Sequence, residues 1–154
     1  LMYRKASNNP VRQPLARMAL ILDGDKKLSE ELLDVLLSEV NIKAVDPSIA
    51  RLKEGGIHDI SGAGVPAPIS AIYVDLNVTS ELHLEGEIRK LERAIQGKRK
   101  DMGMKVGEMA RLIYNPANDD EDKAFAAIDA KKTYISEIKK GAGDAGTFEL
   151  EKVD

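Results

Sequence analysis

The pattern of apolar and polar residues is most regular between Thr79 and Val106. Apolar residues recur there at spacings of four, three, four and seven positions: Leu84, Ile88, Leu91, Ile95 and Met102. Such spacings place side chains on one narrow stripe of an α-helix. We therefore predict a single long amphipathic helix whose apolar stripe is buried.

The predicted helix has residues suited to both of its ends. Thr79 or Ser80 can cap the first turn, and Gly103 can end the helix in the left-handed conformation. Acidic residues crowd the first turns and basic residues the last: Glu81, Glu85, Glu87, Lys98, Arg99 and Lys100. This order complements the helix dipole, which is positive at the start and negative at the end.

A basic face lies roughly opposite the stripe and contains Lys90, Arg93 and Lys100, together with Gly86 and Gly97. A glycine inside a helix costs about 1 kcal/mol relative to alanine. One interpretation is that a bare backbone here lets another backbone or a phosphate approach closely. The other is that the face is simply solvated and tolerates the glycines, and helix energetics alone favour this second interpretation.

Other segments have the pattern of strands, either alternating or as short apolar runs. They are Leu15–Leu22, Ile42–Val45, Ser70–Val78, Met109–Tyr114 and Thr147–Val153. In the last segment, Phe148 and Leu150 are expected to face the core.

Two further helices are predicted. One begins after the cap residue Ser29 and ends at Asn41. Its expected buried residues are Leu32, Leu33, Leu36, Leu37 and Val40. The other begins near Asn118 or Asp119 and continues to Lys140.

These elements predict an α+β protein with helices packed on one face of a small mixed or antiparallel sheet. We expect two small lobes, residues 1–46 and residues 70–154, with a Gly/Pro-rich connector at residues 47–69. The connector is either a mobile linker or a hairpin around Gly62, with a turn of helix near Ile49 to Glu54.

The central stretch resembles a segment near the C-terminus of isoleucyl-tRNA synthetases. The resemblance follows the pattern T-x-E-L-x-x-E-G-x-x-R-x-x-x-R-x-I-Q-x-x-R-K-x-x-G-x-x-V. The matching positions are Thr79, Glu81, Leu82, Glu85, Gly86, Arg89, Arg93, Ile95, Gln96, Arg99, Lys100, Gly103 and Val106. The chain departs from the family at Lys90, where an acidic residue is usual. It departs again at Glu108, Met109 and Ala110, where an acidic-arginine-isoleucine step is usual.

Two earlier segments resemble the same family in the same order. Val11 to Leu15 reads V-R-Q-P-L, like the step that follows the family's anticodon-binding helical bundle. Glu31 to Val45 resembles the helix and strand that continue from it. The resemblance therefore covers almost the whole chain.

Composition narrows the possible functions. The 154 residues are 43% hydrophobic and 32% charged, as in globular proteins. A net charge of −3 argues against coating nucleic acid by bulk charge but allows a local basic face. The absence of cysteine excludes disulfides and thiolate metal sites and is compatible with a cytoplasmic location. No apolar run approaches the ~20 residues of a membrane span, so no membrane partner is expected.

The sequence contains no evident catalytic or metal site. The family's two ATP-binding signatures are absent, and the histidines, His58 and His83, fit neither. The glycine-rich run at 141–146 precedes a predicted strand instead of joining a strand to a helix, which disfavours dinucleotide binding. The acidic residues 119–122 are better explained as a helix start than as a cation site. The resemblance implies that ATP and isoleucine bind a catalytic domain outside this chain, which itself holds no cofactor.

The leading hypothesis is a non-catalytic C-terminal domain of an isoleucine-tRNA ligase that assists tRNA binding near the anticodon stem. The candidate phosphate contacts are Lys90, Arg93, Arg99 and Lys100, with Arg12 and Lys105 as weaker candidates. Expected partners are tRNA and the other domains of the parent synthetase. The alternative is a protein-interaction or structural module of a synthetase-like protein without its own tRNA contact.

Overall fold

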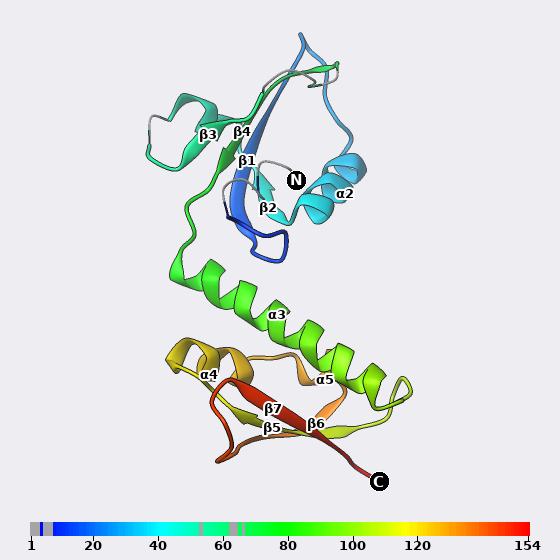
Figure 1. The fold of residues 1–154 in the computed structure, drawn as a ribbon. Helices are drawn as coiled ribbons and strands as arrows, with labels where there is room; N and C mark the ends of the chain where they lie inside the picture. The colour runs from blue at the N-terminus through cyan, green and yellow to red at the C-terminus, as the bar shows by residue number, and fades with distance from the viewer. Residues whose placement is uncertain (1–3, 5–7, 53, 62–64, 66) are drawn as a thin grey trace. The chain divides into compact units, whose positions relative to one another are not determined.

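A computed structural model describes residues 4, 8–52, 54–61, 65 and 67–154 (Figure 1). The chain divides into two compact units, Leu1–His83 and Leu84–Asp154. The boundary falls in the first turn of helix α3 (Ser80–Asp101). Both units combine strands with helices, so the predicted α+β class with two small lobes is confirmed.

A mixed sheet is the centre of the first unit (Figure 1). Among the described residues its strands have the order β2-β1-β4-β3. They are β1 (Leu15–Leu22), β2 (Ile42–Val45), β3 (Ile57–Asp59) and β4 (Ile69–Asp75). β1 pairs in parallel with β2 and antiparallel with β4, and β3 pairs antiparallel with β4. The predicted bounds of β1 and β2 are confirmed.

Helix α2 (Glu30–Val40) connects β1 to β2 and has the predicted ends. The Ser29 hydroxyl accepts a hydrogen bond from the Leu32 N–H, and Asn41 ends the helix with a φ of 53°. Four half-buried residues pack against the core of the sheet: Leu33, Leu36, Leu37 and Val40. The prediction that Leu32 is buried is wrong, since it is 59% exposed. The four packed residues already complete the i, i+3, i+4, i+7 row, and Leu32 lies outside it.

The expected connector is part of the first unit. It contains a 3₁₀ helix, η1 (Pro47–Arg51), whose Ile49 is fully buried, and strand β3. Because β3 pairs with β4, the hairpin interpretation fits better than a mobile linker, although Gly62 itself lies outside the described residues. The two compact units meet between His83 and Leu84, whereas the expected lobes end at 46 and begin at 70, and β4 pairs with β1 in the first sheet. β4 directly precedes α3 in the chain, but this order does not determine which strands it pairs with. The sequence therefore could not show that β4 belongs to the first sheet.

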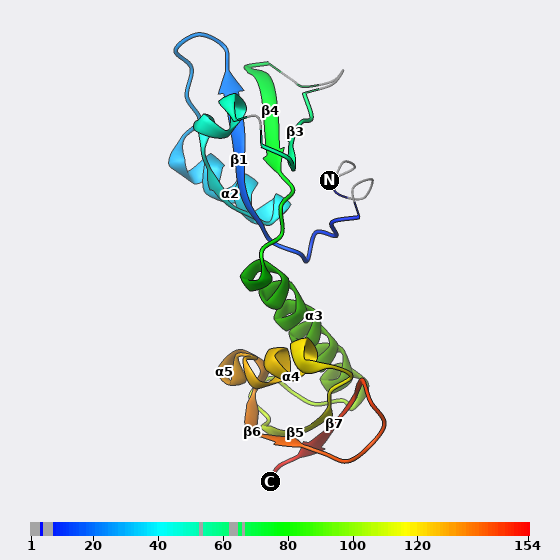
Figure 2. The ribbon, with the colours of Figure 1, turned by 90° about the vertical axis from the view of Figure 1, so that its left-hand side faces the viewer.

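The second unit has a three-stranded sheet with helices on one face (Figures 1 and 2). Within this fully described unit, the strand order is β6-β5-β7. The strands are β5 (Ala110–Asn115), β6 (Ile135–Lys140) and β7 (Thr147–Lys152). β5 pairs in parallel with β6 and antiparallel with β7. The core contains Leu91 and Ile95 of α3 with Leu112 and Leu150 of the sheet, while Phe148 packs against it as predicted.

The predicted helix from Asn118 to Lys140 is wrong in its second half. Asn118 does cap a helix, α4 (Asp119–Ala126), by accepting from the Glu121 N–H. The chain then forms a single-turn helix, α5 (Ala130–Thr133), and strand β6. Tyr134 ends α5 with a φ of 54°, which turns the chain away from the helix axis. Ile135 and Ile138 then pack into the core from a strand.

Candidate nucleic-acid interface

Helix α3 presents an exposed row of basic residues on the side away from its apolar stripe. We call Lys90, Arg93 and Lys100 the basic ridge, and all three are exposed. Arg93 and Lys100 are seven residues apart, which is about two helical turns and about 10 Å along the axis. Their side chains therefore project from nearly the same side of α3.

The charges of the ridge are only partly neutralised. Lys90 Nζ lies 3.3 Å from a carboxylate oxygen of Glu87, as is common for exposed i, i+3 pairs. The side chains of Arg93 and Lys100 form no hydrogen bond or ion pair with any described residue. Two cations in water without a partner are available for an anionic ligand. The Lys98 side chain is also exposed and has no hydrogen-bond or ionic partner among the described residues. It was not among the predicted contacts, although its place in the basic last turn of the helix could have indicated it.

Arg99 does not belong to this exposed face, contrary to the prediction, because it is only 4% exposed. Its Nη2 donates to the carbonyl oxygens of Glu108 at 2.6 Å and Lys105 at 3.2 Å. The guanidinium carbon also lies 5.4 Å from the centre of the Tyr134 ring. These contacts offset the desolvation of a buried cation. Arg99 follows Ile95 by four residues, so helical spacing placed it on the apolar stripe.

A line of polar contacts fixes how α3 sits on its own unit. The buried Glu92 carboxylate accepts from Lys132 Nζ at 2.9 Å and from the Asp129 N–H at 3.1 Å. Gln96 Nε2 donates to the Lys132 carbonyl at 3.1 Å. Together with the apolar stripe, these contacts restrict rotation of α3 about its axis. The basic ridge is therefore held in a defined orientation.

The two weaker candidates lie outside the ridge. Lys105 is exposed in the loop after α3, where its N–H donates to the Glu108 carboxylate at 2.7 Å. That bond helps to lower the pKa of Glu108, although the larger cause is the hydrogen bond from Lys152. Arg12 is exposed in the first unit, beside β1. It is therefore not in the same unit as the ridge.

The two helix glycines have different surroundings. Gly86 is buried, so it is not an open position on the basic face. At Gly97 an added Cβ would meet no described atom within 4 Å, and Gly97 is exposed between Arg93 and Lys100. Close approach by a ligand backbone is therefore sterically possible at Gly97.

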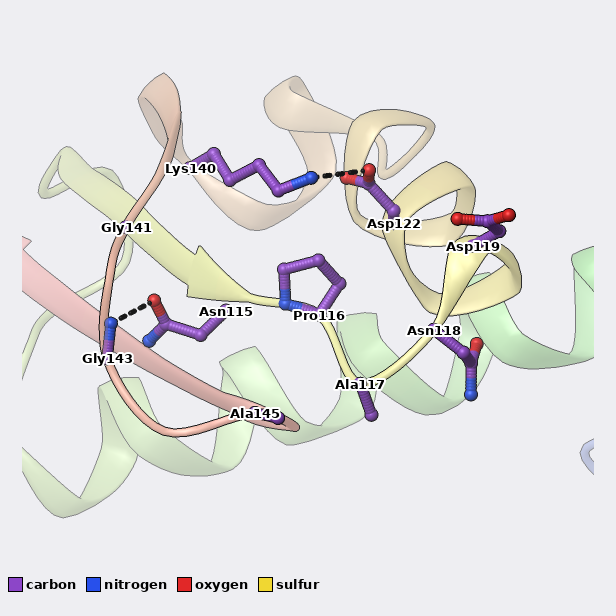
Figure 3. A pocket seen from close by; sticks show the side chains of 10 residues that line it. All are labelled: Asn115, Pro116, Ala117, Asn118, Asp119, Asp122, Lys140, Gly141, Gly143 and Ala145. Atoms are coloured by element: carbon purple, nitrogen blue, oxygen red, sulfur yellow. Dashed lines mark hydrogen bonds and ion pairs between the residues drawn. The ribbon is translucent and has the colours of Figure 1, made fainter.

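The glycine-rich run 141–146 joins β6 to β7 and borders a polar cavity of about 300 Å³ (Figure 3). The Gly143 N–H donates to Asn115 Oδ1 at 2.8 Å, and a Cβ on Gly141 would lie 2.6 Å from the same oxygen. An added Cβ on Gly143 would likewise lie 2.8 Å from Asn115 Nδ2, so a side chain at either position would displace the Asn115 amide. The run does not lead from a strand into a helix, so it lacks the dinucleotide-binding context.

Two of the charged side chains beside this cavity, Lys140 and Asp122, pair with each other (Figure 3). Lys140 Nζ lies 2.8 Å from Asp122 Oδ2, and the Tyr114 hydroxyl donates to Asp122 Oδ1 at 2.9 Å. The bond from Lys140 is the largest cause that lowers the pKa of Asp122. The remaining acidic residues of 119–122 occupy the first turn of α4, where they complement the helix dipole. We assign no ligand to this cavity.

The described part of the chain has neither a cluster of side chains suited to a metal ion nor a membrane-spanning helix. No group of three or more His, Cys, Asp or Glu side chains is placed there to hold a metal ion. None of the described helices is long and apolar enough to cross a bilayer.

The fold and this surface define a two-unit α+β chain whose longest helix carries an exposed basic ridge. No family model matches the chain. It is similar to the isoleucine–tRNA ligase of Methanothrix thermoacetophila, with 46% identity over 50 residues, which is 31% of this chain and 5% of the relative. It is also similar to the isoleucine–tRNA ligase of Methanocaldococcus jannaschii, with 29% identity over 77 residues, which is 50% of this chain and 7% of the relative. The matches agree with the resemblance drawn from the sequence, and they span only a small part of each relative.

Proposed function

We propose that this chain is a non-catalytic part of an isoleucine–tRNA ligase whose basic ridge contacts tRNA near the anticodon stem. The observation that carries the proposal is the pair Arg93 and Lys100, exposed, without ionic partners and on one side of a firmly packed helix. The names of the two similar proteins support tRNA as the anionic partner. A place in the C-terminal region is part of the proposal and rests on the sequence resemblance.

The ridge is suited to the sugar-phosphate backbone and not to the bases. Lysine and arginine contacts to phosphates position a nucleic acid without reading its sequence. The ridge contains no aromatic side chain on which a base could stack. Each phosphate contact releases counterions, so three contacts give a slope of log affinity against log salt of about −2 to −3. With a net charge of −3, binding by the chain is expected to be weak, about 10⁻⁴ to 10⁻⁶ M.

The decisive experiment is the double charge reversal Arg93→Glu with Lys100→Glu, measured by fluorescence anisotropy with isoleucine tRNA over a salt series. We expect weaker binding and a slope flatter by about 2, since two phosphate contacts are lost. The control is Lys26→Glu with Lys27→Glu, two exposed lysines of the first unit, which changes the net charge equally. If both double variants behave alike, the ridge is not the tRNA contact.

The absence of a catalytic role is tested separately. We expect a clean preparation of the chain to show no isoleucine-dependent exchange of pyrophosphate into ATP. Measurable exchange that persists after further purification would contradict the assignment as a non-catalytic part.

One observation favours the alternative of a protein-interaction module. On α2, Leu32 and Val35 are 59% and 60% exposed, and such side chains can contact another protein surface. If the charge reversal leaves tRNA binding unchanged, this alternative takes precedence. It predicts that Leu32→Gln with Val35→Gln weakens association with the rest of the parent synthetase and leaves tRNA binding unaltered.

A further inference from the structure

The loop that follows α3 connects it to β5 (Figure 1), and backbone hydrogen bonds define its conformation. Gly103 has a φ of 66°, its N–H donates to the Lys100 carbonyl at 2.9 Å, and the Met104 N–H donates to the Arg99 carbonyl at 3.0 Å. This pair of bonds is the Schellman arrangement, and Met104 packs against the core as that arrangement favours. The chain then reverses in a turn at residues 105–108, closed by a bond from the Glu108 N–H to the Lys105 carbonyl at 3.2 Å.

The 105–108 turn is anchored from two sides. From the interior, Arg99 Nη2 donates to the carbonyl oxygens of both Lys105 and Glu108. From the sheet, Lys152 Nζ pairs with the Glu108 carboxylate at 2.9 Å, and the same carboxylate accepts from the Lys105 N–H. A turn held by these contacts loses little conformational entropy when it binds a ligand.

The anchored turn presents an apolar side chain. Val106 is 88% exposed, the highest value among the large hydrophobic residues of the described chain. Met102 and Met109, which flank the turn in sequence, are 41% and 39% exposed. Single exposed apolar residues are ordinary. Here three of them fall within eight residues of one segment, and its most exposed member lies on a rigid turn.

The charges around this apolar site are mostly positive. Lys98, Lys100 and Lys105 are exposed, and none forms a side-chain hydrogen bond or ion pair with a described residue. The Glu108 carboxylate is already paired with Lys152, which leaves Asp101 as the acidic side chain of residues 98–109 without an ionic partner. An apolar side chain among unpaired cations complements a ligand that is anionic overall and has an exposed apolar face. An unpaired nucleotide has both properties.

We infer that Val106 packs against an unpaired base of the bound RNA while Lys100 and Lys105 contact the neighbouring phosphates. The inference rests on the proposed function, because Lys100 belongs to the basic ridge and the turn follows it directly in the chain. The ridge contacts the backbone of any RNA, whereas Val106 requires a base that is not stacked in a helix. The 105–108 turn is therefore expected to bind an RNA loop with unpaired bases more tightly than a continuous RNA duplex.

The test compares two labelled RNAs by fluorescence anisotropy with the full chain. One is a hairpin with the anticodon loop of an isoleucine tRNA, and the other is a fully paired duplex with the same number of nucleotides. We expect Val106→Ser to weaken binding of the hairpin about fivefold, with the salt slope and the duplex affinity unchanged, since only apolar contact is lost. The control is Val35→Ser, which alters an exposed valine of the first unit and should change neither affinity.

The outcomes separate this inference from the proposed function. If Val106→Ser leaves hairpin affinity unchanged while Arg93→Glu with Lys100→Glu weakens it, the inference is wrong and the ridge contact stands. An equal loss on both RNAs also overturns the base contact. If only the charge reversal is without effect, the ridge contact and the Lys100 phosphate contact are both wrong, and the contact of Val106 with a base stands alone. If Val106→Ser weakens association with the parent synthetase but not with RNA, a protein surface occupies the turn and the inference is wrong. Should Val106→Ser change the melting temperature, the near-isosteric Val106→Thr replaces it, with a smaller loss expected on the hairpin alone.

Discussion

The two longest helices of the protein bury their apolar sides to different depths. No residue of α2 is fully buried, and Leu33 and Leu36 are only half-buried on the first sheet. In α3, by contrast, Leu91 is 6% exposed and Ile95 is 0% exposed. Both helices have amphipathic sequences, so periodicity alone did not determine the depth of burial. The difference lies in what surrounds each helix.

The surroundings of α3 are more complete. Its stripe packs against β5 and β7 and also against Phe125 of α4, while Glu92 and Gln96 bond to the segment that forms α5. Among the described residues, the apolar side chains of α2 pack on one side only, against the core of the first sheet formed by β1, β2 and β4. A helix fixed on several sides positions its outer face precisely enough to act as a binding surface, because its side chains start from a rigid backbone. This is why the functional proposal rests on α3.

The largest expected effect separates the cores of the two units. Ile95→Ala should destabilise the second unit by about 2–5 kcal/mol, because a fully buried side chain leaves a cavity. Leu36→Ala on α2 should cost the first unit about 1–2 kcal/mol, since only part of its side chain leaves water. Urea unfolding followed by circular dichroism gives the free energies, and peptide-resolved hydrogen exchange assigns each to its unit. Equal costs for the two variants would remove the contrast between the helices.

The next effect tests the buried cation of α3. Arg99→Met keeps the length of the side chain but leaves the buried-side Glu108 carbonyl without its donor and the Lys105 carbonyl with only the Glu108 N–H, so we expect a loss of about 1–3 kcal/mol. Arg93→Met on the exposed side of the same helix is the matched control and should change stability by less than about 0.5 kcal/mol. The same urea titration measures both. A small cost at Arg99 would mean that water or another group satisfies those carbonyls.

The contrast between these arginines also shows what the sequence could predict. Helix caps were predictable because each depends on one local residue: Ser29, Asn41, Gly103 and Asn118 have the expected roles. The apolar stripe of α3 was predictable from helical spacing as far as Ile95, but the prediction that Met102 is buried is wrong, since Met102 follows the end of the helix and is 41% exposed. Arg99 was misassigned because its charge was given more weight than its spacing of four residues from Ile95.

Long-range pairing was the part that could not be predicted. Residues 135–140 read as the end of a helix because Ile135 and Ile138 have helical spacing, but they pair with β5 instead. β4 was placed with the helix that follows it, whereas its partners are β1 and β3. Both errors concern partners that are distant in sequence, which local propensity and periodicity do not specify.

A smaller effect is expected at the exposed glycine of α3, a residue type that α2 lacks. Gly97→Ala should stabilise the second unit by about 1 kcal/mol, because the added methyl group meets no described atom and alanine favours a helix. If an RNA backbone approaches Gly97 closely, the same variant should bind tRNA more weakly while being more stable. Thermal melting and anisotropy measured on the same protein separate the two. A gain in stability with unchanged affinity would support the simple solvated face.

The smallest effect concerns the outer edge of α2. Leu32→Gln should change the stability of the first unit by less than about 0.5 kcal/mol, because the side chain is 59% exposed and both residues favour helices. Leu33→Gln, one residue further on, is the matched control, and its cost should exceed that of Leu32→Gln because Leu33 packs on the sheet. A larger cost at Leu32 would mean that another surface covers this leucine in solution.

If that surface is a second copy of the chain, the melting temperature of the unaltered chain should rise with protein concentration, since association stabilises the folded form by mass action. A melting temperature independent of concentration together with a negligible cost at Leu32 would leave the exposed edge of α2 available for a protein partner, as the interaction-module alternative requires.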